Sequence, residues 1–150
     1  MAYERLKMQY PHIDVIEKIL PKGLGGLYYD NIIEIDKYKN KYEKHCILAE
    51  ELGHHETTYG DIIELDDTTS IKLELVARRW GYKKIVSFEN LIDCYISGHK
   101  TPEDICEHLE ITLNYLYDAI NVYNQIYGLF AMHKGYKIFF DPLNIEKEFF

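Results

Sequence analysis

The residues best suited to chemistry lie in the stretch Glu50-Glu51-Leu52-Gly53-His54. In zinc sites carried on a helix, two ligands four residues apart lie on one face, and the residue after the first ligand is a glutamate that activates water. Glu50 and His54 have this spacing, and Glu51 stands at the position of the general base. A carboxylate oxygen is an accepted zinc ligand. The stretch therefore predicts a metal site in which Glu50 takes the place of a first histidine.

A second ligand pair, Glu51 and His55, has the same spacing but is the weaker alternative. Leu52 would then stand at the base position, and the site would lack a catalytic acid or base. Gly53 adds independent information, since a glycine inside a helix costs roughly 1 kcal/mol relative to alanine. We therefore expect another element or a substrate to approach the helix closely at Gly53.

Other polar residues near this stretch have both a functional and a structural interpretation. His55 is expected to hydrogen-bond or to cap the helix end, with support of the metal ligands as the alternative. Tyr59 and Asp61 could stabilise an oxyanion or orient a ligand, although turn residues of these types are usually structural. Arg78 and Arg79 could bind a peptide carboxylate, but solvent-facing arginines are the more common case.

Composition restricts the class of protein. The 150 residues include 25 acidic and 17 basic ones, for a net charge of −8, which disfavours direct binding to nucleic acid. The three cysteines have no paired spacing, which argues against a disulfide framework and a cysteine zinc knuckle. No apolar run is long enough for a membrane span or a secretory signal. We expect a cytoplasmic protein.

Hydrophobic spacing predicts the elements that position these residues. We expect a helical arm over residues 3–20, interrupted at Pro11, and a hairpin over 27–36 that turns at Asp30-Asn31. Residues 42–55 form the proposed active-site helix. An acidic turn over 61–70 leads to a second helix over 71–84, which supplies Glu74.

The remaining residues predict a helical unit with a terminal strand. Helices are expected over 87–97, from Thr101 to 109 and over 112–127, with Ser87 and Thr101 as N-caps, and a strand over 135–140 can pair with 129–133. Residues 101–127 have a helix-turn-helix outline. They contain no Lys or Arg, so DNA binding is disfavoured, and most of their tyrosines are expected to pack in the core.

Three segments together resemble a known family: Cys46 to His55, Thr57 to Asp61, and Leu73 to Trp80. They are similar to the motif regions of phage-encoded ImmA/IrrE metallopeptidases, and the resemblance spans roughly residues 26–128. It implies that Glu74 is the third metal ligand, beside Glu50 and His54, and that the metal is zinc. It also implies an endopeptidase that cleaves a transcriptional repressor of a phage or mobile element.

These observations predict an α+β fold, mainly helical, with a zincin-like active-site helix, a small antiparallel sheet and a helical C-terminal subdomain. We expect a metallopeptidase core over residues 1–98 and a helix-turn-helix-like subdomain with a terminal strand over 99–150. The expected function is zinc-dependent proteolysis in which Glu51 activates metal-bound water. The alternatives are a non-catalytic module that sequesters a repressor and a DNA-associated regulator.

Overall fold

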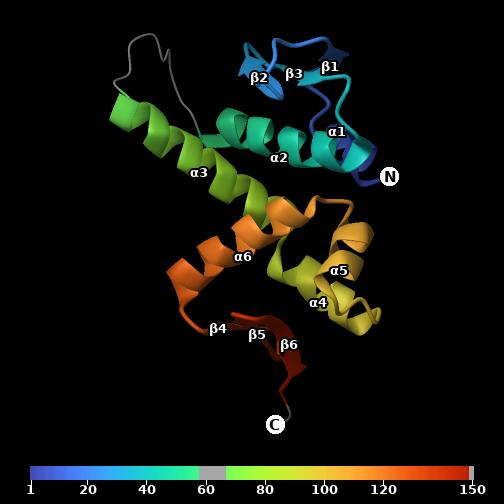
Figure 1. Ribbon diagram of the computed structural model, residues 1–150, viewed down its shortest axis with the longest axis vertical. Coiled ribbons are helices and arrows are strands. Elements are labelled where there is room, and N and C mark those ends of the chain that lie inside the picture. Colours follow the sequence, from blue (N-terminus) through green and yellow to red (C-terminus); the bar gives the residue numbers. More distant parts are fainter. Residues whose placement is uncertain (58–66, 149–150) are drawn as a thin grey trace. The chain divides into compact units, whose positions relative to one another are not determined.

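The computed structural model describes residues 1–57 and 67–148 (Figure 1). They fall into two units, Met1–Lys84 and Ile85–Phe150. The boundary expected after residue 98 lies inside the second unit, because helix α4 (Phe88–Ile96) packs against later elements of that unit.

In its described residues, 1–57 and 67–84, the first unit contains a sheet and three helices. Its elements are α1 (Ala2–Met8), β1 (Asp14–Lys18), β2 (Gly26–Tyr29), β3 (Ile32–Asp36), α2 (Lys41–Thr57) and α3 (Asp67–Ile85), the last of which ends one residue into the second unit. The predicted helical arm over residues 3–20 is therefore correct only for α1. Its second half is wrong, because Asp14–Lys18 pairs in parallel with β3 as a strand.

The sheet has the strand order β1-β3-β2. β2 and β3 form the predicted hairpin, in which Asp30 and Asn31 both have positive φ angles, of 46° and 61°. Two residues in this conformation match the twist of a tight hairpin, and Asn and Asp tolerate it better than other non-glycine residues. The predicted antiparallel sheet is mixed, since β1 adds in parallel at the other side of β3. Helix α2 packs against β2 and β3.

Helix α2 starts at a reciprocal cap and ends beside α3. The backbone N–H of Glu43 donates to Asn40 Oδ1 (2.8 Å), and the backbone N–H of Asn40 donates to Glu43 Oε1 (3.1 Å). At Gly53 a Cβ atom would lie 2.2 Å from the backbone oxygen of Ala77 in α3. The close approach predicted from this glycine is confirmed, and it brings α2 and α3 together where the chemistry-bearing residues lie.

The second unit consists of three helices followed by a three-stranded antiparallel sheet. Its elements are α4, α5 (Pro102–Leu109), α6 (Leu113–Tyr127), β4 (Phe130–His133), β5 (Tyr136–Phe140) and β6 (Leu143–Lys147). The predicted caps are confirmed, because the side chains of Ser87 and Thr101 accept hydrogen bonds from the backbone three residues later. The predicted pairing of β4 with β5 is also confirmed, whereas β6 was not predicted.

A cluster of aromatic rings lies within the mainly aliphatic core of the second unit. Tyr123 is almost fully buried and donates its hydroxyl to the backbone oxygen of Val86 at 2.8 Å. Its ring lies 5.3 Å from that of Phe88, which also stacks on Phe140. The expectation that most of the α6 tyrosines pack in the core is correct for Tyr123 and wrong for Tyr117 and Tyr127, which are both exposed.

The cysteines Cys46, Cys94 and Cys106 are all buried thiols outside any disulfide. Burial raises the pKa of the Cys94 thiol to about 12 and that of Cys106 to about 11.

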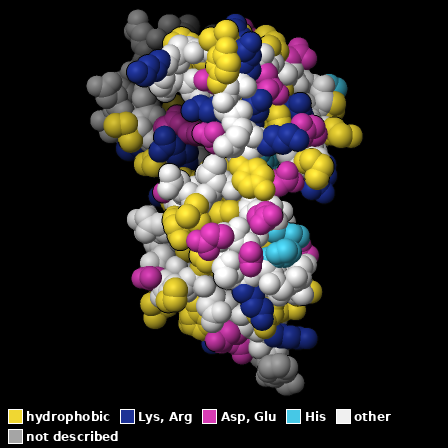
Figure 2. Space-filling view, turned by 45° about the vertical axis from the view of Figure 1, so that its right-hand side comes forward, with side chains coloured by type: hydrophobic (Ala, Val, Ile, Leu, Met, Phe, Trp, Pro, Cys, Tyr) yellow, Lys and Arg dark blue, Asp and Glu magenta, His cyan; other side chains and the backbone are white. Residues whose placement is uncertain are grey.

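No helix in residues 1–57 and 67–148 is both long and apolar enough to cross a membrane. Lys and Arg side chains are interspersed with Asp and Glu on the face seen in Figure 2. The predicted fold class, α+β and mainly helical, is confirmed.

Candidate functional site

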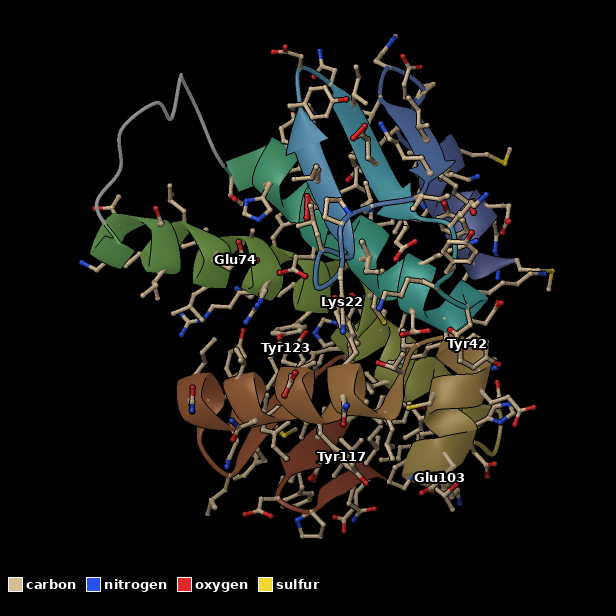
Figure 3. The ribbon with its side chains drawn as sticks, turned by 45° about the horizontal axis from the view of Figure 1, so that its top comes forward. Lys22, Tyr42, Glu74, Glu103, Tyr117 and Tyr123 are labelled. Atoms are coloured by element: carbon tan, nitrogen blue, oxygen red, sulfur yellow. The ribbon has the colours of Figure 1, made fainter. Side chains whose placement is uncertain are left out.

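The close contact between α2 and α3 brings predicted site residues together from both helices. His54 Nε2, on α2, lies 2.9 Å from Glu74 Oε2, on α3. Figure 3 labels Glu74 where α3 runs beside α2. Glu50 is one turn before His54 on α2 and interacts with Glu74 as well. Two carboxylates and one imidazole therefore come together although twenty residues separate His54 from Glu74 in the sequence.

Arg78 lies at the same place. Its Nε donates a hydrogen bond to Glu50 Oε1 at 2.9 Å and lies 3.7 Å from Glu74 Oε1. Arg78 follows Glu74 by one helical turn, so both side chains lie on the face of α3 that meets α2. The sequence suggested a solvent-facing arginine or one that binds a peptide carboxylate, and the structure shows that Arg78 contacts carboxylates of its own chain.

Burial and neighbouring charges change the acidity of the ligand candidates. Burial raises the pKa of Glu50 above its ordinary value, the adjacent Glu74 raises it further, and Arg78 acts in the opposite direction. Burial lowers the pKa of His54. A neutral imidazole is the form that binds a metal ion, so the surroundings of His54 favour the ligand form at neutral pH.

Glu51 is more buried than Glu50, His54 and Glu74, and it lies under strand β2. Its exposed fraction is 9%, and a Cβ atom placed on Gly26 of β2 would lie 3.2 Å from Glu51 Cγ. Burial, together with the nearby charges of Glu50 and Glu74, raises the pKa of Glu51 to about 8. A carboxyl group with a pKa near neutrality can both accept and release a proton at physiological pH, which suits a general base.

Tyr28 is a site residue that sequence reasoning missed. Its hydroxyl lies 2.7 Å from His55 Nδ1, and the two rings meet edge to face at 5.4 Å. The hydrogen bond expected for His55 is thus present, and it orients that side chain toward β2. The available signal was the alternation along β2, since Tyr28 lies two residues after Gly26 and therefore on the same face of the strand.

The donor chemistry of the site fits zinc. Imidazole nitrogen and carboxylate oxygen are common zinc ligands, and Glu50, His54 and Glu74 supply one nitrogen donor and two carboxylates. In the described part of the chain, however, no three His, Cys, Asp or Glu side chains are already arranged around a single metal position. Instead, His54 contacts Glu74 directly, and the Arg78 guanidinium lies next to Glu50.

Tyr59 and Asp61, which the sequence offered as additional site residues, lie outside the described residues.

Comparison with protein-family models, with curated proteins and with solved structures gives no match to this chain. The resemblance to ImmA/IrrE proteins therefore stays a prediction.

Proposed function

We propose that this chain is a metal-dependent endopeptidase, with zinc as the expected ion and Glu50, His54 and Glu74 as its ligands. The observation that carries the proposal is the meeting of His54 and Glu74 across α2 and α3 beside the buried Glu51. This arrangement combines a neutral nitrogen donor, carboxylate donors and a carboxyl group of raised pKa within one small region.

The protein residues have separate roles in the proposed reaction. Zinc, when bound, supplies a Lewis acid that polarises the scissile carbonyl. Glu51 accepts a proton from the attacking water and later donates it to the leaving amine, and a pKa of about 8 suits both steps. His54 and Glu74 hold each other in position through their 2.9 Å contact.

Strand β2 offers a place for an extended substrate. It is an edge strand of the sheet β1-β3-β2, and it packs against α2. An edge strand can add a peptide through backbone hydrogen bonds that demand no particular sequence. Leu27 and Tyr29 are exposed on this strand. We propose a protein substrate and, following the sequence resemblance, a transcriptional repressor of a mobile element.

A non-catalytic binding module is the second candidate, and one observation favours it. The ion pair between Arg78 and Glu50 gives a proposed ligand a partner within the protein, so the region is already charge-compensated without a metal ion. Such a protein would capture its partner through the same edge strand and would leave it intact.

Metal content of the chelator-treated protein after dialysis against zinc tests the site. We expect one equivalent of zinc in the wild type and in the control Glu107→Ala, which changes an exposed glutamate on α5. Glu50→Ala, His54→Ala and Glu74→Ala are expected to lose it. A wild type that binds no zinc would refute the enzyme proposal.

Glu51→Gln separates the enzyme from the binding module. It is expected to retain zinc and partner binding but to lower the cleavage rate of a quenched fluorescent peptide library about 10²- to 10⁴-fold, the usual contribution of a general base. If the wild type binds zinc but cleaves the peptide library no faster than Glu51→Gln does, the binding module is favoured.

A further inference from the structure

Large apolar side chains lie exposed along one short segment of the second unit. Residues 126–132 run from the last turn of α6 through most of β4, and five of them are large hydrophobic residues with at least 40% of their surface exposed. They are Ile126, Tyr127, Leu129, Phe130 and Met132. Exposed apolar residues that gather in one place, unlike scattered ones, are typical of an interaction surface.

Strand β4 is one edge of the sheet β4-β5-β6, and no strand of the described residues pairs with its outer side (Figure 1). The N–H of Phe140 donates to the backbone oxygen of Leu129 at 3.2 Å, across the pair of strands β4 and β5. Backbone groups alternate in direction along a strand, so Ala131 also faces β5, whereas the N–H and C=O groups of Phe130 and Met132 point away from it. These outward groups are available to another strand.

The outer edge of β4 lacks the features that usually prevent the addition of a strand. Natural edge strands carry charged residues, above all lysine, or proline. β4 has the sequence Phe-Ala-Met-His and contains neither, whereas β6, the opposite edge of the same sheet, contains Glu146 and Lys147. His133 is occupied within the chain, since its Nε2 lies 2.8 Å from Glu89 Oε1. Within this sheet, β4 is therefore the edge better suited to accept a strand.

A second copy of β4 is complementary to the first in its backbone and side chains. In an antiparallel pair about a two-fold axis perpendicular to the sheet, Ala131 can lie opposite itself, and Phe130 of each copy then lies opposite Met132 of the other. This register brings the outward backbone groups of Phe130 and Met132 together, so that they exchange hydrogen bonds in both directions. Their side chains lie on one face and meet across the pair, where methionine sulfur against an aromatic ring is favourable.

Charge also favours a second copy. Residues 125–133 carry no Lys, Arg, Asp or Glu, so the two strands meet without like charges although the chain has a net charge of −8. The same register places Lys134 of one copy opposite Gly128 of the other, where α6 ends without a basic residue in its last turn. The carbonyl groups at a helix end favour a cation. Lys134 lies 3.3 Å from Glu89 Oε1, but 70% of its side chain is exposed, so it can reach across.

We infer that the protein forms a symmetric homodimer through β4, in which the two sheets join into one continuous antiparallel sheet. The dimer involves the second unit and is independent of the metal site proposed on α2 and α3. Ile126 and Tyr127 precede β4 in the chain and add apolar surface beside the joined strands. Because β4 is short, the interface belongs to the small and weak class, and dimerisation depends on protein concentration.

Sedimentation equilibrium of the full chain over a range of concentrations tests the dimer. We expect a reversible equilibrium between monomer and dimer in the wild type. Met132→Pro removes an N–H that points away from β5, so the sheet of the monomer keeps its hydrogen bonds while the dimer loses one from each strand. At the usual net contribution of a hydrogen bond, the dissociation constant of the dimer should rise about tenfold.

Lys147→Pro is the matched control, because it removes an outward N–H from the opposite edge of the same sheet. The N–H of Glu148 donates to the backbone oxygen of Gly135 at 2.9 Å, so Glu148 faces β5 and Lys147 faces away from it. Lys147→Pro should dimerise like the wild type. Circular dichroism of both proline variants checks that each is folded.

Amide hydrogen exchange, measured by NMR, follows β4 in the wild type without any substitution. In the monomer the N–H groups of Phe130 and Met132 are open to water and should exchange faster than that of Ala131, which faces β5. Exchange at Phe130 and Met132 should slow as the protein concentration rises, whereas exchange at Ala131 should change little. This measurement tests the dimer even if Met132→Pro folds poorly.

The outcomes distinguish a second copy from other occupants of the edge. A dimer that is weakened by Met132→Pro and not by Lys147→Pro, with concentration-dependent protection of the Phe130 and Met132 amides, supports the inference. A monomer at every concentration up to the solubility limit overturns it, as does a dimer that leaves both amides unprotected. Protection of these amides in a monomer, either by the chain itself or only after a foreign extended peptide is added, also overturns it.

Discussion

Gly53→Ala sets two physical effects against each other at the contact between α2 and α3. In an isolated helix the change would stabilise α2 by up to about 1 kcal/mol, because alanine has the higher helix propensity. In this protein the new Cβ atom would lie 2.2 Å from the Ala77 oxygen, 2.9 Å from its carbonyl carbon and 3.1 Å from its Cα. All three are backbone atoms, so no side-chain rotation can relieve the overlap.

The overlap determines the sign of the change. The distance to the Ala77 oxygen is about 1 Å short of a normal van der Waals contact, so the helices must separate by a comparable amount. Overpacking of this kind costs about 1 to 3 kcal/mol, and the lack of any flexible neighbour places Gly53→Ala near the upper end. After the gain in propensity, we expect a net loss of about 2 kcal/mol in the free energy of unfolding.

Urea unfolding, monitored through the fluorescence of Trp80, measures this loss in the first unit. Trp80 is the only tryptophan of the chain, lies on α3, and contacts the ring of Tyr10 edge to face at 6.3 Å. The control is Lys72→Ala on the exposed side of α3, for which a change within about 0.5 kcal/mol is expected. Separation of the helices should also weaken zinc binding, since His54 and Glu74 move apart. An unchanged or increased stability of Gly53→Ala would refute the close approach of α2 and α3.

Two further predictions concern buried polar groups. In the metal-free wild type, stability is expected to fall as the pH rises from about 4.5 to about 8, because the folded protein keeps Glu51 protonated in this range while the unfolded chain does not. Glu51→Gln should lack this part of the fall and should be more stable than the wild type at pH 8.5. Urea unfolding at a series of pH values measures this. Parallel curves of unfolding free energy against pH for the two proteins would contradict the burial of Glu51. Tyr123→Phe leaves the buried Val86 carbonyl without its hydroxyl donor. The free energy of unfolding, measured by circular dichroism, should fall by about 1 to 3 kcal/mol. The control Tyr117→Phe changes an exposed hydroxyl and should cost less than about 0.5 kcal/mol, so equal losses in the two variants would argue against the hydrogen bond.

Local sequence signals predicted the elements whose causes are local. Caps such as Ser87 and Thr101 depend on residues three positions apart, and the hairpin turn depends on Asp30 and Asn31 alone. Non-local pairing explains the failures. β1 was expected to be helical, because the spacing of its apolar residues fits a helix, but its conformation depends on parallel pairing with β3. β6 was missed for a related reason, since its pairing partner β5 rather than its own pattern determines it.

The candidate site shows the same division. The spacing of Glu50, Glu51 and His54 follows from one helix, and Gly53 indicated correctly that another element lies close. The depth of Glu51 and its raised pKa could not be read from the sequence, because they depend on how β2 packs over α2. Nor could the sequence show that Arg78 contacts Glu50, since the two lie 28 positions apart on different helices.

The buried cysteines allow the opening of each unit to be measured from its rate of thiol modification. A thiol reagent modifies only an accessible thiolate, so reaction at these positions requires transient opening of the surrounding structure. Cys46 lies one turn before Glu50 on α2, whereas Cys94 and Cys106 belong to the second unit. Mass spectrometry of the unlabelled protein can therefore follow the opening of the two units separately. Zinc that bound at α2 and α3 would slow modification of Cys46 and leave the rates at Cys94 and Cys106 unchanged.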